Sequence, residues 1–204
     1  MWGLVESGSI TKIINKPKGL VVGDIRYSRK IFELWSKSEL EAIGIYEVEF
    51  DNSNKKDEQW YINTNQTFTY DADAGTVTAT YGDATAKAHA DTLFTAQDET
   101  DGLGPEGEVA TRGLKYNLIK TVKAQAAGIL QDTDWYIVRK ADAGTAVPSS
   151  ITNHRAAVRT KAAEMETAIT NASDTPALET LYTYTEQEDK SVTRPLGELP
   201  RLES

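Results

Sequence analysis

The sequence contains no cysteine among its 204 residues, so disulfide bonds, thiolate nucleophiles and cysteine-ligated metal sites are excluded. No stretch approaches the roughly 20 consecutive apolar residues that a membrane-spanning helix requires. The first residues have neither the basic region nor the apolar run of a secretion signal. We therefore expect a soluble protein that is not exported by a conventional signal.

Positive charge is also scarce, because 22 basic residues face 31 acidic ones and the net charge is −9. Binding to nucleic acid requires clustered lysine and arginine, and an anionic membrane surface attracts the same side chains. We therefore expect neither nucleic acid nor a membrane as partner. The hydrophobic share of 39% and the charged share of 26% are those of an ordinary globular protein.

The side chains that usually carry catalysis are few and lie in unpromising places. The two histidines, His89 and His154, lack the spacing of a metal site, and helix-flank or packing roles are favoured over catalysis. The acidic segment 71–75 matches a calcium loop only in part, since Gly75 stands where a third ligand is needed. Neither a phosphate-binding loop nor a Gly-x-Ser-x-Gly motif is present. We therefore expect no enzyme activity, no cofactor and no metal.

The first part of the chain, residues 1–96, is predicted to be a mostly antiparallel β-rich domain with a short helix. Residues 2–6 and 10–14 are short apolar runs joined by a hairpin turn, and Ser36 can cap a helix that ends at Gly44. Residues 60–70 and 76–81 are rich in aromatic and β-branched residues, which favours two strands joined by a loop. The spacing of residues 84–94 suggests a short helix.

Residues 97–107 combine three glycines, a proline and several acids, and are predicted to be a linker. Residues 108–184 are predicted to form a helical domain, built as a helical hairpin or bundle. Its third helix carries an apolar face with intervals of seven, four, three and four residues, which is close to a coiled-coil seam. That face consists of Ile151, Val158, Ala162, Met165 and Ile169.

Residues 185–204 are polar and contain two prolines, so they are predicted to be an extended C-terminal tail. Its leucines Leu196, Leu199 and Leu202 recur every three residues and could contact a neighbouring subunit. The predicted fold class is therefore α+β, with a β-rich N-terminal part, a helical C-terminal part and a tail.

Two stretches of sequence resemble small tail proteins of tailed double-stranded DNA bacteriophages, the group of tail-fibre, fibre-assembly and baseplate-associated proteins. The first stretch is Leu34-Trp35-Ser36-x-x-Glu39-Leu40-x-Ala42-Ile43-Gly44-Ile45-Tyr46-x-Val48. The second is Thr133-Asp134-Trp135-Tyr136-x-x-Arg139-Lys140-Ala141-x-x-Gly144-Thr145-x-Val147-Pro148, followed by His154-Arg155-x-x-Val158-Arg159. Together they cover about a quarter of the chain and mark a module, with no chemistry attached.

The resemblance implies a structural protein of the virion tail that is made in the host cytoplasm and docks onto other tail proteins, as a homo-oligomer within the particle. An assembly chaperone absent from the mature particle is the first alternative. A receptor- or carbohydrate-binding module using Trp60, Tyr61, Phe68 and Tyr70 is the second. In the second stretch, Trp135 is expected to fill the corner between two helices, with arginines near acids such as Asp134. The candidate partner-binding residues are Trp135, Arg139, His154, Arg155, Arg159, Leu196, Leu199 and Leu202.

Overall fold

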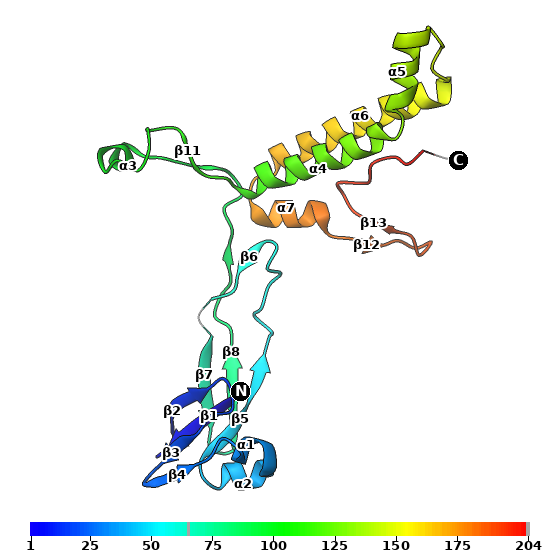
Figure 1. Cartoon of the computed structure of the whole chain (residues 1–204). Coiled ribbons are helices and arrows are strands. Elements are labelled where there is room, and N and C mark those ends of the chain that lie inside the picture. The colour runs from blue at the N-terminus through cyan, green and yellow to red at the C-terminus, as the bar shows by residue number, and fades with distance from the viewer. Residues whose placement is uncertain (65, 203–204) are drawn as a thin grey trace. The chain divides into compact units, whose positions relative to one another are not determined.

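The computed structural model describes residues 1–64 and 66–202, and it divides the chain into two compact units. Unit 1 is Met1–Thr85 and unit 2 is Ala86–Ser204 (Figure 1). Most strands lie in the N-terminal part and the long helices in the C-terminal part, which confirms the predicted mixed α+β class. None of the described helices combines the length and the hydrophobicity that crossing a bilayer would demand.

Unit 1 is built around a five-stranded sheet with the strand order β2-β1-β5-β8-β7. Neighbouring strands run antiparallel except β5 and β8, which are parallel. The hairpin β3–β4 and two short helices complete the unit. The elements are β1 (Trp2–Glu6), β2 (Ser9–Ile14), β3 (Leu20–Val22), β4 (Ile25–Tyr27), α1 (Ile31–Leu34), α2 (Lys37–Glu41), β5 (Ile45–Asp51), β6 (Tyr61–Ile62), β7 (Thr67–Asp71) and β8 (Thr76–Thr80).

Alternation along the strands gives this sheet two apolar faces. Leu4 and Ile45 are register partners and belong to a core cluster that also includes buried side chains of β3, α1 and α2. Val48, Val77 and Ala79 form a smaller cluster on the other face. Because side chains of successive strand residues point to opposite faces, one sheet can serve both clusters.

The predicted short helix is α2, which begins after the predicted cap Ser36 and ends at Glu41, three residues before Gly44. Ser36 Oγ accepts a hydrogen bond from the Glu39 N–H, and the Glu39 carboxylate accepts one from the Ser36 N–H, which is a capping box. Gly44 follows the helix with φ +80°, and a Cβ at this position would clash with the backbone carbonyl of Val5. Only glycine fits this close approach of two backbones without strain.

Unit 2 consists of long helices and small hairpins. The helices α4 and α6 pack against each other, and α7 packs on α6. β9 (Thr85–Ala86) lies at the boundary between the units. The remaining elements are β10 (Thr92–Leu93), α3 (Ala96–Thr100), β11 (Val109–Thr111), α4 (Leu114–Gln131), α5 (Asp134–Ala143), α6 (Ser149–Asn171), α7 (Thr175–Tyr182), β12 (Thr185–Glu186) and β13 (Val192–Thr193).

The apolar face predicted for the third helix is confirmed in α6, because all five of its residues are buried. Gly144 ends α5 in the left-handed conformation, with φ 69°, as a C-terminal glycine commonly does. The N-terminal cap of α7 is Asp174, whose side chain accepts the N–H of Ala177. Thr175 is the first helical residue, and its hydroxyl donates to the carbonyl of Lys87 at 2.6 Å.

Three predicted segments differ from the structure. Residues 84–94 contain the strands β9 and β10 instead of a helix. Residues 97–107 are not a linker but lie between the paired strands β10 and β11, and part of them forms α3. A capping box between Thr95 and Asp98 starts this helix and explains why a glycine-rich segment is ordered. The predicted extended tail begins with the hairpin β12–β13, so residues 185–193 are not extended either.

Candidate docking surfaces of the helical unit

The corner between α4 and α5 is closed by the side chain of Arg155, which is only 8% exposed. Its Nη1 donates to the carbonyl of Leu130 at 2.7 Å and to the hydroxyl of Thr133 at 2.6 Å. Its Nη2 pairs with the carboxylate of Asp134 at 2.8 Å. The Leu130 carbonyl also accepts the N–H and the hydroxyl of Thr133. The guanidinium therefore adds a charged donor to a carbonyl of the last turn of α4 and also binds the acid that begins α5.

The prediction that Trp135 fills this corner is wrong, because its side chain is 51% exposed. Arg155 occupies the corner instead, because its guanidinium reaches the Leu130 carbonyl and the Asp134 carboxylate at once. The single N–H of an indole ring could not make both contacts. Trp135 lies instead against the ring of Tyr136, with centroids 4.0 Å apart. The guanidinium of Arg139 lies 4.6 Å above the Trp135 ring, and its Nε is buried without a hydrogen-bond partner.

Helix α5 buries none of its ten residues, although it carries several large apolar side chains. Trp135, Ile137 and Val138 are 51%, 43% and 64% exposed. A short helix with this much uncovered apolar surface gains little from its own fold, because most helical stability comes from packing. We define these three side chains as the α5 surface, the first candidate docking surface.

Two other predicted contact residues on α6 are internal. His154 is 9% exposed, and Arg155 is held in the corner described above. Both side chains are therefore covered by their own chain, and the expectation that they contact a partner is corrected on that ground. Arg159 is exposed and stays a candidate.

The C-terminal segment packs back onto the helices of unit 2. Leu196 is 2% exposed, and its N–H donates to the carbonyl of Leu181 at 3.0 Å. The prediction that Leu196 contacts a neighbouring subunit is therefore wrong, since its side chain is already buried in its own chain. Leu199 is half-buried and Leu202 is 45% exposed, so these two leucines stay candidates.

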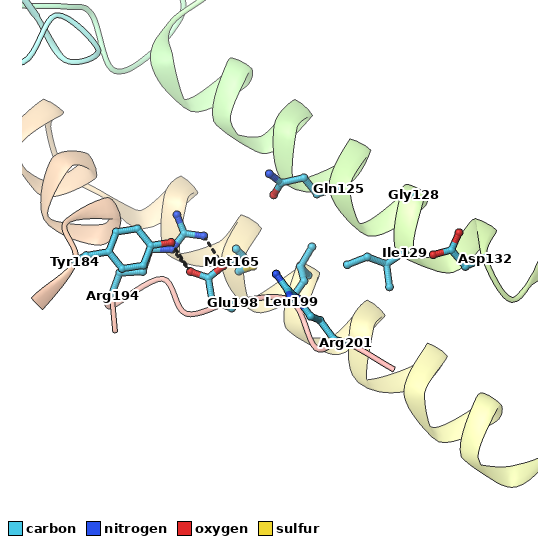
Figure 2. Close-up of a pocket in the computed structure, with 10 residues that line it drawn as sticks. All are labelled: Gln125, Gly128, Ile129, Asp132, Met165, Tyr184, Arg194, Glu198, Leu199 and Arg201. Carbon is cyan, nitrogen blue, oxygen red and sulfur yellow. Dashed lines mark hydrogen bonds and ion pairs between the residues drawn. The ribbon is translucent and has the colours of Figure 1, made fainter. Parts of the chain in front are cut away.

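A groove of about 860 Å³ lies between α4, α6 and the C-terminal segment, and it is the second candidate docking surface (Figure 2). Ile129, Met165 and Leu199 supply its apolar lining. Arg194 and Glu198 stand at one end, where their side chains pair at 2.8 Å. Gln125, Asp132 and Arg201 also line the groove, so its walls are mixed polar and apolar. An open groove of this kind suits an extended peptide segment, which offers both backbone polar groups and side chains.

Tyr184 belongs to the same end of the groove. Its hydroxyl donates to Glu198 Oε1 at 2.7 Å, and this hydrogen bond to a carboxylate raises the pKa of the tyrosine. Arg194 lies 5.2 Å from the ring centroids of both Tyr182 and Tyr184. These contacts are local in sequence, and they fix the wall of the groove that the C-terminal segment provides.

The base of the β10–β11 hairpin is tied to the start of α4 by Asp91. Its carboxylate accepts the N–H of Gly113 at 2.8 Å and the guanidinium of Arg112 at 2.6 Å. These two contacts, the Gly113 hydrogen bond first, lower the pKa of Asp91 below its ordinary value of 3.8. A Cβ on Gly113 would clash with the carbonyl of Ala90, so the approach is specific to glycine.

We expect the stabilising contribution of Asp91 to be fully present above pH 4 and to be lost as the pH falls through its lowered folded-state pKa. A carboxyl whose folded pKa is depressed stabilises the fold only while it is ionised. The amide resonance of Gly113, followed by nuclear magnetic resonance between pH 6 and pH 2, should shift with a midpoint below 3.8. A midpoint at or above that value would show that the Gly113 hydrogen bond does not form in solution.

Two of the four aromatic rings proposed for carbohydrate binding are buried. Trp60 and Tyr61 are 3% and 5% exposed, so neither ring can stack on a sugar. Phe68 and Tyr70 are half-buried against the smaller cluster of the sheet, and the Tyr70 hydroxyl donates to that of Tyr46 at 3.1 Å. These side chains pack within unit 1 and do not form an exposed aromatic platform.

Among residues 1–64 and 66–202, no cluster of three or more histidine, aspartate or glutamate side chains is arranged to hold a metal ion. Comparisons with protein-family models, with curated proteins and with solved structures find no match to this chain.

Some features of the site could not be found from sequence periodicity. The groove is lined by α4, α6 and the C-terminal segment, which are distant in sequence, and nothing in any one of them indicates the others. The order of residues 97–107 did have a sequence indication, since Thr95 stands three residues before Asp98, as in a capping box.

Proposed function

We propose that this chain is a structural protein of a bacteriophage tail, associated with the fibre or baseplate, and that it docks onto neighbouring tail subunits. The α5 surface carries the proposal. Three large apolar side chains on a helix with no buried residue are typical of a surface that another protein covers. The assignment to a phage tail is suggested by the resemblance of the two stretches 34–48 and 133–159 to phage tail proteins. The second of these stretches contains α5.

The way in which α5 is held supports a docking role. Arg155 fixes the start of the helix through Asp134 and Thr133, so α5 keeps a defined direction although it buries little itself. A preorganised surface loses less conformational entropy on binding than a mobile one. Trp135 and Arg139 add the residue types that most often dominate the energy of protein–protein interfaces.

Mass spectrometry of purified virions tests this proposal. The chain should be present in complete particles at a fixed ratio to the other tail proteins. Its absence from complete particles, together with its presence in infected cells, would contradict the structural role.

An assembly chaperone that leaves before the particle is complete is the second candidate, and the groove favours it. A groove of about 860 Å³ with mixed polar and apolar walls could hold an extended segment of a fibre protein during assembly. In that case, co-expression of the chain should be required for the fibre protein to become soluble, while purified virions should lack the chain. The two candidates therefore predict opposite results in the same particles.

A further inference from the structure

The segment between β10 and β11 is an ordered projection of unit 2, here called the acidic arm (residues 92–111) (Figure 1). It carries five carboxylates and no basic residue. The backbone of Phe94 pairs with Glu108 at 2.9 Å and with Gly107 at 3.0 Å, and a Cβ on Gly104 would clash with the Phe94 ring. The arm is therefore folded by its own short contacts.

The arm exposes apolar side chains as well as charge. Leu93 is 48% and Leu103 is 65% exposed. The acids of the arm are Asp98, Glu99, Asp101, Glu106 and Glu108. The Thr95 N–H and hydroxyl hold Asp98 as its carboxylate and lower its pKa, so this charge persists in mildly acidic solution.

Unit 1 contains a segment of the opposite charge. Residues 12–30 carry six basic residues and one acidic residue, in a chain whose net charge is −9. Arg29 pairs with Glu33, and among the described residues the other five cations form no ion pair. We define these five as the basic hairpin surface: Lys12, Lys16, Lys18, Arg26 and Lys30.

The basic hairpin surface also has exposed apolar side chains. Val21 and Arg26 are register partners in the β3–β4 ladder, so their side chains project from the same face of the hairpin. That face is opposite to Leu20, which is buried in the core of unit 1. Val21 is 57% exposed on this face. Ile25 pairs with Val22 and projects from the other face of the hairpin, where it is 58% exposed.

We propose that the acidic arm of one copy of this chain binds the basic hairpin surface of a second copy. The arm is acidic, the hairpin surface is mainly basic, and each includes exposed aliphatic side chains, so the pair combines electrostatic steering with an apolar contact. Because the two surfaces are different, the contact is head-to-tail, and repeated contacts either close a ring or continue as a filament. A second copy is favoured over a polyanion because the complementary surface is present on the same chain.

This self-association rests on the proposed docking role and would be one of its contacts. It is tested with the purified chain alone. Analytical ultracentrifugation over a range of protein concentrations should detect reversible self-association that weakens as salt is raised, because salt screens exposed charges. The chain can be present in purified virions without associating with itself, and it can associate with itself without being present in virions. The two experiments therefore test the two proposals separately.

Two charge-reversal variants make the test specific. The arm variant is E106K/E108K, and the hairpin variant is K16E/K18E. All four side chains are exposed, and none of them takes part in the ion pairs of the described residues. Each variant alone should lower the self-association constant by about tenfold or more, because like charges then face each other. An equimolar mixture of the two variants should restore association, and so should a single chain that carries all four substitutions.

Matched control variants carry the same change of net charge at positions outside the acidic arm and the basic hairpin surface. E186K/E188K on the β12–β13 hairpin controls for the arm variant, and K120E/K140E on α4 and α5 controls for the hairpin variant. Both controls should associate as the unmodified chain does. Circular dichroism of every variant checks that the fold is retained.

Several outcomes would overturn the proposal. They are a chain that stays monomeric at all concentrations, single variants that associate normally, and a mixture that fails to associate although both proteins are folded. A short DNA duplex is the probe for the rival reading of the basic hairpin surface. If K16E/K18E abolishes DNA binding while E106K/E108K leaves self-association unchanged, the surface binds a polyanion and the proposal is wrong.

Discussion

Replacing Arg155 by methionine is expected to lower the free energy of unfolding of unit 2 by about 3 kcal/mol. Methionine retains much of the apolar volume of the side chain but none of its donors. The carbonyl of Leu130 and the hydroxyl of Thr133 then lose the guanidinium, and Asp134 loses its ion pair. Because Arg155 is buried, water cannot replace these hydrogen bonds without opening the corner.

Urea titration followed by helical circular dichroism measures this loss. Arg159→Met is the matched control, since Arg159 lies one turn away on the same helix with an exposed side chain. The control is expected to change stability by no more than about 0.5 kcal/mol. Equal stability of the two variants would mean that the guanidinium does not hold the α4–α5 corner.

The second large effect is expected from the α5 surface. The triple variant W135S/I137S/V138S should keep the fold, because α5 buries none of its residues. Its affinity for a neighbouring tail subunit should fall by about a hundredfold or more, since exposed aromatic and aliphatic anchors carry most of the energy of such contacts. Quantitative mass spectrometry of particles assembled with the variant measures how much of the chain is incorporated.

The control for this experiment introduces serine at three exposed positions of α6, as T152S/A156S/A157S. It should be incorporated as well as the unmodified chain. Normal incorporation of the α5 variant would remove this helix from the docking interface. An equal loss in both variants would point to a folding defect rather than a lost contact.

Long periodic segments were predictable from the sequence, because burial acts on every turn of a helix. The α6 face is an example, with Val158 and Ile169 fully buried as its spacing indicates. The hairpin between residues 2–6 and 10–14 was also predictable, since local turn chemistry determines it. In both cases the information lies within a few residues of the element that it specifies.

Features that depend on distant partners were not predictable. Trp135 was expected to fill the helical corner, but Arg155 occupies it, because its guanidinium binds the Leu130 carbonyl and the Asp134 carboxylate at once. Val48 and Phe50 alternate with acids, as on one apolar face of a strand, yet Val48 is buried and Phe50, near the end of β5, is 50% exposed. Periodicity identifies a face of a strand or helix, but it does not indicate how far the neighbouring elements extend over that face.

The parallel pairing of β5 with β8 has a consequence for the order of folding. Val48 pairs with Val77, so a long loop must close before β5 acquires its second neighbour. The contacts of β7 with β8 are local and can form earlier, as a hairpin. During synthesis, β5 therefore leaves the ribosome with one edge unpaired and stays so until β8 follows. Closure of this ladder is the natural rate-limiting step for unit 1, and the waiting edge of β5 is the place most exposed to aggregation.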